Sequence, residues 1–266
     1  MNASWSFRRV WWPATLLAAW LCAVPAVGAA GVDSLFDQAN KLYEQGKYAD
    51  AAAAYGQVVT TADGSATVWF NLGNAQFKAG QTGRAIAAWL QAEQLAPRDP
   101  AVRFNLAFAR KRVTGAETAP GPLWQRTLRS LTLNEWTVLA ACVSWVWFTL
   151  LALREFQPAL RPALRGYTFT AGAATLLLAG CLAAAVAAQS RLRPGVVVVP
   201  EAILRSGPLD EARTLHPMRD GTEVTVLDMK PVGGGPNPVS WLEVRDAAGR
   251  TGWAKADQFA VIGSRR

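Results

Sequence analysis

The chain has 266 residues, of which 51% are hydrophobic and only 17% are charged, a balance that indicates membrane segments. Its net charge of +8 is spread thinly along the sequence, which argues against nucleic-acid binding because that function needs a concentrated basic face. The three cysteines, Cys22, Cys142 and Cys181, all lie in apolar stretches. We therefore expect neither a disulfide framework nor thiol chemistry in the polar parts of the chain.

Residues 1–30 have the features of a secretory signal peptide. An Arg8-Arg9 pair precedes an apolar stretch at residues 10–27, and small residues follow it. We expect cleavage near Ala29 or Ala30, with an uncleaved membrane anchor as the alternative. In both cases the segment that follows is expected to lie outside the cytoplasm.

Residues 31–115 repeat with a fixed period, because Ala39, Gly73 and Ala107 lie 34 residues apart. This is the period of the tetratricopeptide helix–turn–helix repeat, which the segment resembles. The middle unit carries most of that pattern, at Trp69, Leu72, Gly73, Ala85, Trp89, Ala92 and Pro97. We expect two repeats followed by a capping helix at residues 100–113, and the resemblance implies a domain that binds proteins and does no chemistry.

In the tetratricopeptide family the first helix of each unit lines a concave groove, which implies a partner-binding surface here. The repeat register predicts the following binding residues: Phe36, Asn40, Tyr43, Phe70, Asn71, Asn74, Phe77, Lys78 and Phe108. The third helix also offers Phe104, Asn105 and Lys111. We expect some of these aromatic residues to serve repeat packing instead of binding.

Some members of that family clamp the terminal carboxylate of a peptide with asparagines and cations at set groove positions. Asn40 and Asn71 match the two amide positions. Phe36, Ala101 and Asn105 stand where the cations belong, so the charge-assisted bonds of such a clamp are missing. We therefore expect an aromatic and amide-lined groove for an extended or helical segment.

Two apolar segments at residues 133–153 and 167–188 are each long enough for a transmembrane helix, which needs about 20 residues. A linker at residues 116–132 separates them from the repeats. The loop between them, residues 154–166, carries three arginines against one glutamate, which predicts a cytoplasmic loop. Because the signal sequence and this loop agree, we expect the repeats and the C-terminal region on the non-cytoplasmic side of the bacterial cytoplasmic membrane.

Residues 195–262 alternate between apolar and polar side chains in short runs, which is typical of a small all-β barrel. The region resembles the bacterial Src-homology-3-like domain at Ala202–Pro208, Asp220–Val224, Trp241–Val244 and Gly252-Trp253. Residues 231–238 depart from it as a longer loop. Trp241, Trp253 and Phe259 are candidates for a ligand platform, but their alternation with apolar residues favours a core or half-core role at least for Trp253.

The order of these parts resembles the E-type proteins of the aerotolerance (Bat) operon. The expected fold class is a multidomain membrane protein, with an all-α tetratricopeptide array, a two-helix transmembrane hairpin and a small all-β Src-homology-3-like barrel. The resemblance implies a cell-envelope scaffold that works beside von Willebrand-type and AAA-type partners encoded in the same operon.

The sequence predicts no enzyme and no cofactor. The single histidine, His216, has no partner for a metal site, and we expect it in a surface loop. The glycines at residues 233–235 lack the lysine and helix of a phosphate-binding loop. Two functions remain: a membrane-anchored scaffold that recruits proteins through its groove, or a cell-wall module that places an envelope enzyme or complex on peptidoglycan.

The predicted topology can be tested with reporter fusions placed after Gly115, Gly166 and Ile262. We expect them to report non-cytoplasmic, cytoplasmic and non-cytoplasmic positions in that order. Paired phosphatase and fluorescent-protein reporters measure this directly. A cytoplasmic signal at Ile262 would contradict the second span.

Overall fold

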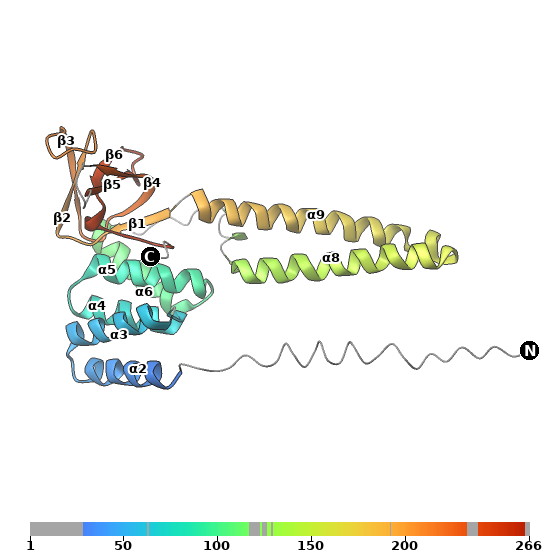
Figure 1. The fold of residues 1–266 in the computed structure, drawn as a ribbon, viewed down its shortest axis with the longest axis horizontal. Coiled ribbons are helices and arrows are strands. Elements are labelled where there is room, and N and C mark those ends of the chain that lie inside the picture. Colours follow the sequence, from blue (N-terminus) through green and yellow to red (C-terminus); the bar gives the residue numbers. More distant parts are fainter. Residues whose placement is uncertain are drawn as a thin grey trace, which may run out of the picture.

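The computed structural model describes residues 29–62, 64–116, 123, 127–128, 130–191, 193–232 and 239–263. A helical array, a long helical hairpin and an antiparallel β domain follow one another along the chain, as Figure 1 shows. This confirms the predicted fold class at the level of a tetratricopeptide-like array, two apolar helices and a β-sheet domain. The predicted signal sequence up to residue 28 and the loop at residues 233–238 lie outside the described residues.

The array consists of helices that stack in chain order, from α2 at its outer end to α5 beneath the β domain (Figure 1). Each turn has a local cause: Gly46 and Gly80 adopt positive φ values of 74° and 81° after α2 and α4. Asp99 caps α6 by accepting hydrogen bonds from the first backbone N–H groups. The helices are α2 (Ala29–Glu44), α3 (Tyr48–Ala62), α4 (Ala66–Lys78), α5 (Thr82–Leu95) and α6 (Pro100–Thr114).

Close helix packing in the array depends on small residues beside two large ones. Tyr55 and Trp89 are each 2% exposed and lie among buried alanines. A Cβ atom on Gly73 would lie 2.5 Å from Trp89 Nε1, so glycine is required for the indole to cross α4. The repeat positions therefore hold small residues because a large side chain of the same unit occupies the space next to them.

The hairpin is formed by α8 (Leu133–Phe156) and α9 (Arg161–Arg191), joined by a short 3₁₀ helix (Pro158–Leu160). Thr132 starts α8 through a capping box, because its side chain accepts from Glu135 N–H while the Glu135 carboxylate accepts from Thr132 N–H. Within the pair, Gly172 allows Trp147 to pack against α9, since an added Cβ would lie 2.9 Å from Trp147 Nε1.

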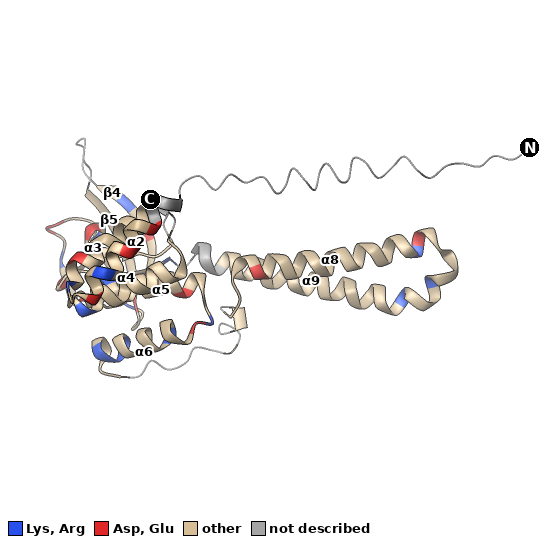
Figure 2. Ribbon diagram, turned by 90° about the horizontal axis from the view of Figure 1, so that it is seen from below, with Lys and Arg blue, Asp and Glu red and all other residues tan. Residues whose placement is uncertain are grey.

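Both hairpin helices are long and apolar enough to cross a membrane. Only 6% and 11% of their spanning residues are buried inside the structure, far less than a core helix of a soluble protein would bury. Figure 2 shows the shaft of the hairpin almost free of charged residues, with charges gathered at its ends. Arg154, Arg161 and Arg165 lie at the end farthest from the array and the β domain.

The β domain is one antiparallel sheet with the strand order β3-β2-β6-β5-β4-β1-β7. Its core contains Leu204, Leu242 and Val244, which are all fully buried. Strand β1 begins at Arg193, two residues after α9 ends, so the hairpin leads directly into the sheet. The strands are β1 (Arg193–Val197), β2 (Glu201–Arg205), β3 (Thr214–Arg219), β4 (Glu223–Val232), β5 (Val239–Asp246), β6 (Thr251–Lys255) and β7 (Phe259–Val261).

One expectation for the β domain is wrong. His216 lies in strand β3 and not in a loop, and its Nε2 atom is 3.3 Å from Asp246 Oδ2. Trp241 is 3% exposed and belongs to the buried residues, whereas Trp253 is only partly buried, which agrees with the core or half-core role expected for it. The alternating pattern marked both tryptophans as strand residues but left open which face of the sheet was covered.

The array and the β domain share a core, which the sequence analysis did not foresee. Val196 and Ile262 belong to the same buried cluster as Ile86 and Trp89 of the array. At the start of α5, Gly83 N–H donates to Asp220 Oδ2 at 3.0 Å. A bidentate ion pair joins α6 to β4, with Arg110 Nε 2.6 Å and Nη2 3.0 Å from the Glu223 carboxylate.

This shared core predicts that Gly83→Ala destabilises the protein. The new Cβ would lie 2.0 Å from Val197 O and 2.3 Å from Asp220 Oδ1, so α5 and the sheet must separate. We expect a loss of about 1–3 kcal/mol, as for other overpacked sites. Thermal unfolding of the full chain in detergent, followed by circular dichroism, measures the loss.

Gly56→Ala is the matched control, because a Cβ there meets nothing within 4 Å. Alanine in this helix interior is expected to leave stability unchanged or raise it by up to about 1 kcal/mol. Equal melting temperatures for the two variants would contradict the shared core.

Candidate partner-binding groove

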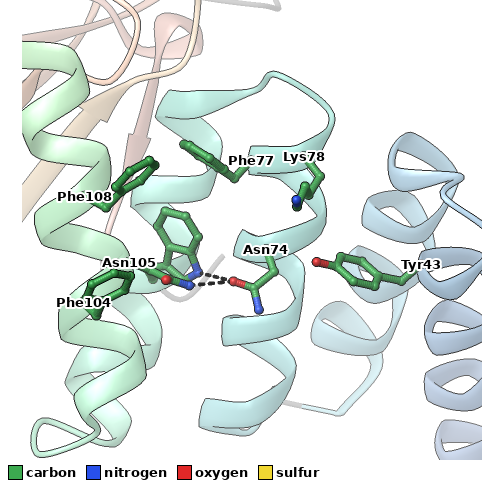
Figure 3. A pocket seen from close by; sticks show the side chains of 8 residues that line it. Tyr43, Asn74, Phe77, Lys78, Phe104, Asn105 and Phe108 are labelled. Atoms are coloured by element: carbon green, nitrogen blue, oxygen red, sulfur yellow. Dashed lines mark hydrogen bonds between the residues drawn. The ribbon is translucent and has the colours of Figure 1, made fainter.

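A hollow of about 250 Å³ opens between helices α4 and α6, on the side of the array that also carries Tyr43 of α2 (Figure 3). Every lining residue comes from the first helix of a repeat unit except Trp89, which lies on α5. The lining residues are Tyr43, Asn74, Phe77, Lys78, Trp89, Phe104, Asn105 and Phe108. The hollow is therefore built where the repeat geometry predicts the groove.

Aromatic rings supply most of the lining. Phe77 packs against Trp89 with their ring centres 5.6 Å apart, and against Phe108 at 5.8 Å. Phe104 and Phe108 are 70% and 52% exposed, although both are large apolar side chains. Exposed phenylalanines beside a hollow are typical of a surface that a partner covers.

A pair of amides forms the floor of the hollow. Trp89 Nε1 donates to Asn74 Oδ1 at 3.2 Å and to the Phe70 carbonyl at 3.3 Å. Asn105 Nδ2 donates to the same Asn74 oxygen at 2.8 Å, as the dashed lines in Figure 3 show. Because an indole N–H can only donate, Trp89 fixes the orientation of the Asn74 amide. The floor is thus held in one arrangement before a partner binds.

Tyr43 faces the hollow from α2 (Figure 3). Burial, together with the neighbouring Tyr48, raises the pKa of Tyr43 above its ordinary value. Its ring packs edge-on against Tyr48 with the centres 5.2 Å apart. The Tyr43 hydroxyl therefore stays protonated at neutral pH and can donate or accept a hydrogen bond.

The structure separates the predicted binding residues into two groups. Tyr43, Asn74, Phe77, Lys78 and Phe108 line the hollow. The other four, Phe36, Asn40, Phe70 and Asn71, do not.

Two of the four, Asn40 and Asn71, lie beside the hydroxyl group of the buried Tyr55. Its hydroxyl donates to Asn40 Oδ1 at 2.6 Å, and burial raises the Tyr55 pKa even though a hydrogen bond with Asn71 lowers it. Phe36 packs edge-on against the same ring at 5.8 Å. Asn40 is therefore already bonded within the array, and neither asparagine lines the hollow.

Equivalent repeat positions have different surroundings at the end of the array. Phe36, Phe70 and Phe104 are each separated by one repeat length in the sequence. Phe36 and Phe70 pack against the buried clusters that include the next helices. In the part of the chain that the structure describes, no second helix follows α6 as α5 follows α4, so Phe104 stays exposed.

Trp89 is the groove residue that the sequence analysis did not identify. From the sequence it is named only as a position of the repeat pattern, and in the structure it is a packing residue with 2% exposure. Its single polar atom nevertheless reaches the floor of the groove. A buried tryptophan needs an acceptor for its N–H, and this requirement is the signal that could have connected it to Asn74.

Comparison with known families agrees with this geometry. Residues 36–101 match the tetratricopeptide repeat family. The match covers α3, α4, α5 and most of α2, and it ends at the start of α6. No curated protein matches the chain. The tetratricopeptide repeat is a non-catalytic, protein-interaction fold, so the array is best understood as a surface for protein partners.

Among the described residues, no group of three or more His, Cys, Asp or Glu side chains could hold a metal ion. The hollow itself is lined by aromatic rings, amides, one phenol and one ammonium group. Such groups can contact a bound segment through shape complementarity and hydrogen bonds.

The two central phenylalanines should respond differently to truncation. Phe77 is partly buried against Trp89, so Phe77→Ala is expected to lower the free energy of unfolding by about 2 kcal/mol or more. Phe108→Ala should cost clearly less, because half of its surface is already exposed. Urea unfolding of the full chain in detergent measures both. Equal losses would show that Phe108 is a packing residue and not a surface for a partner.

Proposed function

We propose that this chain is a membrane-anchored scaffold of the cell envelope, which recruits protein partners through the groove between α4 and α6. The observation that carries the proposal is the hollow itself, with Phe104 and Phe108 exposed above an amide floor that is already ordered. Exposed aromatic side chains around a hollow are the usual anchors of a protein interface. The tetratricopeptide match supports a protein partner over a small-molecule substrate.

The hairpin is proposed as the membrane anchor. The array, the β domain and the ends of α8 and α9 that connect to them all lie at one end of the hairpin (Figure 1). Arg98 of the array pairs with Glu135 at the start of α8, which ties the array to this end. This arrangement supports a topology in which both soluble parts face the same, non-cytoplasmic side and the arginine-rich end faces the cytoplasm.

The aerotolerance (Bat)-type complex is the proposed setting of the scaffold. The order of a tetratricopeptide array, two spans and a β domain supports it. The von Willebrand-type and AAA-type proteins of such operons are the proposed partners. The groove is proposed to act on the non-cytoplasmic face, where partners with an exported segment can reach it.

Wall binding by the β domain is the weaker of the two functions. Two of its three candidate platform residues, Trp241 and Phe259, are 3% and 7% exposed. The third, Trp253, has the Lys230 ammonium 4.9 Å from its ring centre. One face of the Trp253 ring is therefore already covered by a lysine of the same domain. The β domain instead packs on α5 and supports the array.

A photoreactive phenylalanine analogue at position 104 tests the scaffold proposal in cells. We expect covalent capture of a discrete protein partner, detected as a shifted band and identified by mass spectrometry. The same analogue at Leu215, an exposed residue of β3, is the control and should capture none. Phe108→Ala should reduce capture at position 104 by roughly thirtyfold, the effect of losing about 2 kcal/mol at an interface anchor.

Equal capture at positions 104 and 215 would contradict a specific groove. The wall-binding alternative predicts a different result, in which the Phe108→Ala protein still sediments with purified peptidoglycan. Sedimentation that depends on the β domain, together with no capture at position 104, would replace the scaffold proposal.

A further inference from the structure

We infer that the groove selects an acidic segment with apolar anchors, taken from within a partner chain and not from its terminus. The inference rests on the proposed role of this groove as the protein-binding site. It adds the chemistry of the partner, which the repeat pattern does not specify. Three features of the described residues carry it: the cations beside the hollow, the unused donors of its floor and the occupied positions of a terminal-carboxylate clamp.

The cations gather at one end of the hollow. Lys78 lines it from the last turn of α4. Arg112, in the last turn of α6, lies over the Phe77 ring, with its guanidinium carbon 5.7 Å from the ring centre. No aspartate or glutamate lines the hollow. A partner segment seated on the phenylalanines therefore meets positive charge and no negative charge from the lining.

Helix α6 as a whole has the same charge bias. It carries four cations and no acidic residue between Pro100 and Thr114, and Figure 2 shows basic residues along it. Arg110 is directed to the β domain, where Glu223 neutralises it. Arg103 and Arg112 remain exposed to solvent. The cations beside the hollow, Lys78 and Arg112, favour a ligand with carboxylates beside its apolar side chains.

The floor of the hollow offers donors. Asn74 Oδ1 already accepts from Trp89 and Asn105, which directs its Nδ2 group away from both residues (Figure 3). That nitrogen has no hydrogen-bond partner among the described residues. Together with the Lys78 ammonium, it presents N–H groups to the hollow. Backbone carbonyls and side-chain carboxylates of a bound segment are the matching acceptors.

Recognition of a chain terminus is disfavoured by the same structure. Of the two asparagines that a terminal-carboxylate clamp would use, Asn40 accepts a hydrogen bond from the buried Tyr55, and Asn71 lies close enough to lower the pKa of the same hydroxyl. Phe36, Ala101 and Asn105 occupy the positions of its cations. The cations that are present, Lys78 and Arg112, lie instead beside Phe77 at one end of the hollow. They can pair with side-chain carboxylates along an internal segment.

The same cations can also stabilise their helices, and this role is different from ligand selection. Lysine and arginine in the last turn of a helix also offset the helix dipole. That role stabilises α4 and α6 but selects no ligand. A measurement of peptide preference distinguishes the two roles, because only ligand selection depends on the charge of the peptide.

The test uses the full chain in detergent micelles and short fluorescent peptides with amidated C-termini. One peptide pool combines phenylalanine or leucine with glutamate, a second replaces glutamate with lysine, and a third replaces the apolar residues with alanine. Fluorescence anisotropy gives the Kd of each pool. We expect the acidic–apolar pool to bind most tightly, and its binding to weaken as salt is raised.

Charge reversal by Lys78→Glu with Arg112→Glu should weaken binding of the acidic–apolar pool roughly tenfold or more, from the loss of two charge pairs. The neutral pair Lys78→Gln with Arg112→Gln should have an intermediate effect. Arg213→Glu with Arg219→Glu changes the net charge equally on the exposed surface of the β domain and should leave binding unchanged. Melting of each variant shows whether the fold is retained.

The outcomes separate this inference from the proposed scaffold. An unchanged peptide preference in the folded charge-reversed protein, with capture still observed at position 104, overturns the acidic selection and leaves the scaffold standing. Tighter binding of a peptide with a free C-terminal carboxylate than of its amidated form overturns the internal-segment inference. If the chain with the analogue at position 104 and no other substitution captures no partner, both the proposed scaffold function and this inference are contradicted.

Discussion

The close approach of helix α5 to the β domain is the contact on which the rest of the structure depends. Gly83 meets the sheet so closely that its N–H bonds to Asp220, and a single added methyl group would collide with the Val197 carbonyl. The core of the last repeat continues across this contact into β1 and the residues around β7. A short tetratricopeptide array usually needs at least three units or a polar cap to bury its core. Here the β domain covers the exposed side of α5, so the array is completed by a different fold.

This arrangement gives the groove a rigid support. Trp89 lies in the shared core and also orients the Asn74 amide on the floor of the hollow. Helix α6, which supplies Phe104 and Phe108, is held on its other side by the ion pair between Arg110 and Glu223. Arg110 is largely buried, and although burial alone lowers its pKa, the hydrogen bond and charge of Glu223 raise it above its ordinary value. One wall, α6, therefore bonds directly to the β domain, and the other, α4, is held by Trp89 of the shared core, so little further ordering of the walls is needed when a partner binds.

The apolar hairpin is connected to the array and the β domain at two points. Strand β1 follows α9 after one intervening residue, and the Arg98–Glu135 pair joins the turn before α6 to the start of α8. Both links join the hairpin to the parts of the chain that carry the groove. If the hairpin is the anchor, a partner bound between α4 and α6 would stay close to the membrane.

Local patterns in the sequence determined the repeats, the hairpin helices and the β-strands of this protein, because each of these elements produces its own pattern of apolar and polar residues over short distances in the chain. The spacing of Ala39, Gly73 and Ala107 determined the repeats, charge-free runs predicted the hairpin helices, and alternation in residues such as Ser240–Arg245 predicted the strands. Those periods also placed Asn74, Phe77 and Phe108 correctly on one surface. Tertiary structure alone decided that Phe70 is covered while Phe104, its repeat equivalent, is open, since exposure depends on which helix comes next. It also decided that Gly83 must be a glycine, because the atoms that crowd it lie more than a hundred residues away in the sequence and no local period can report such a contact.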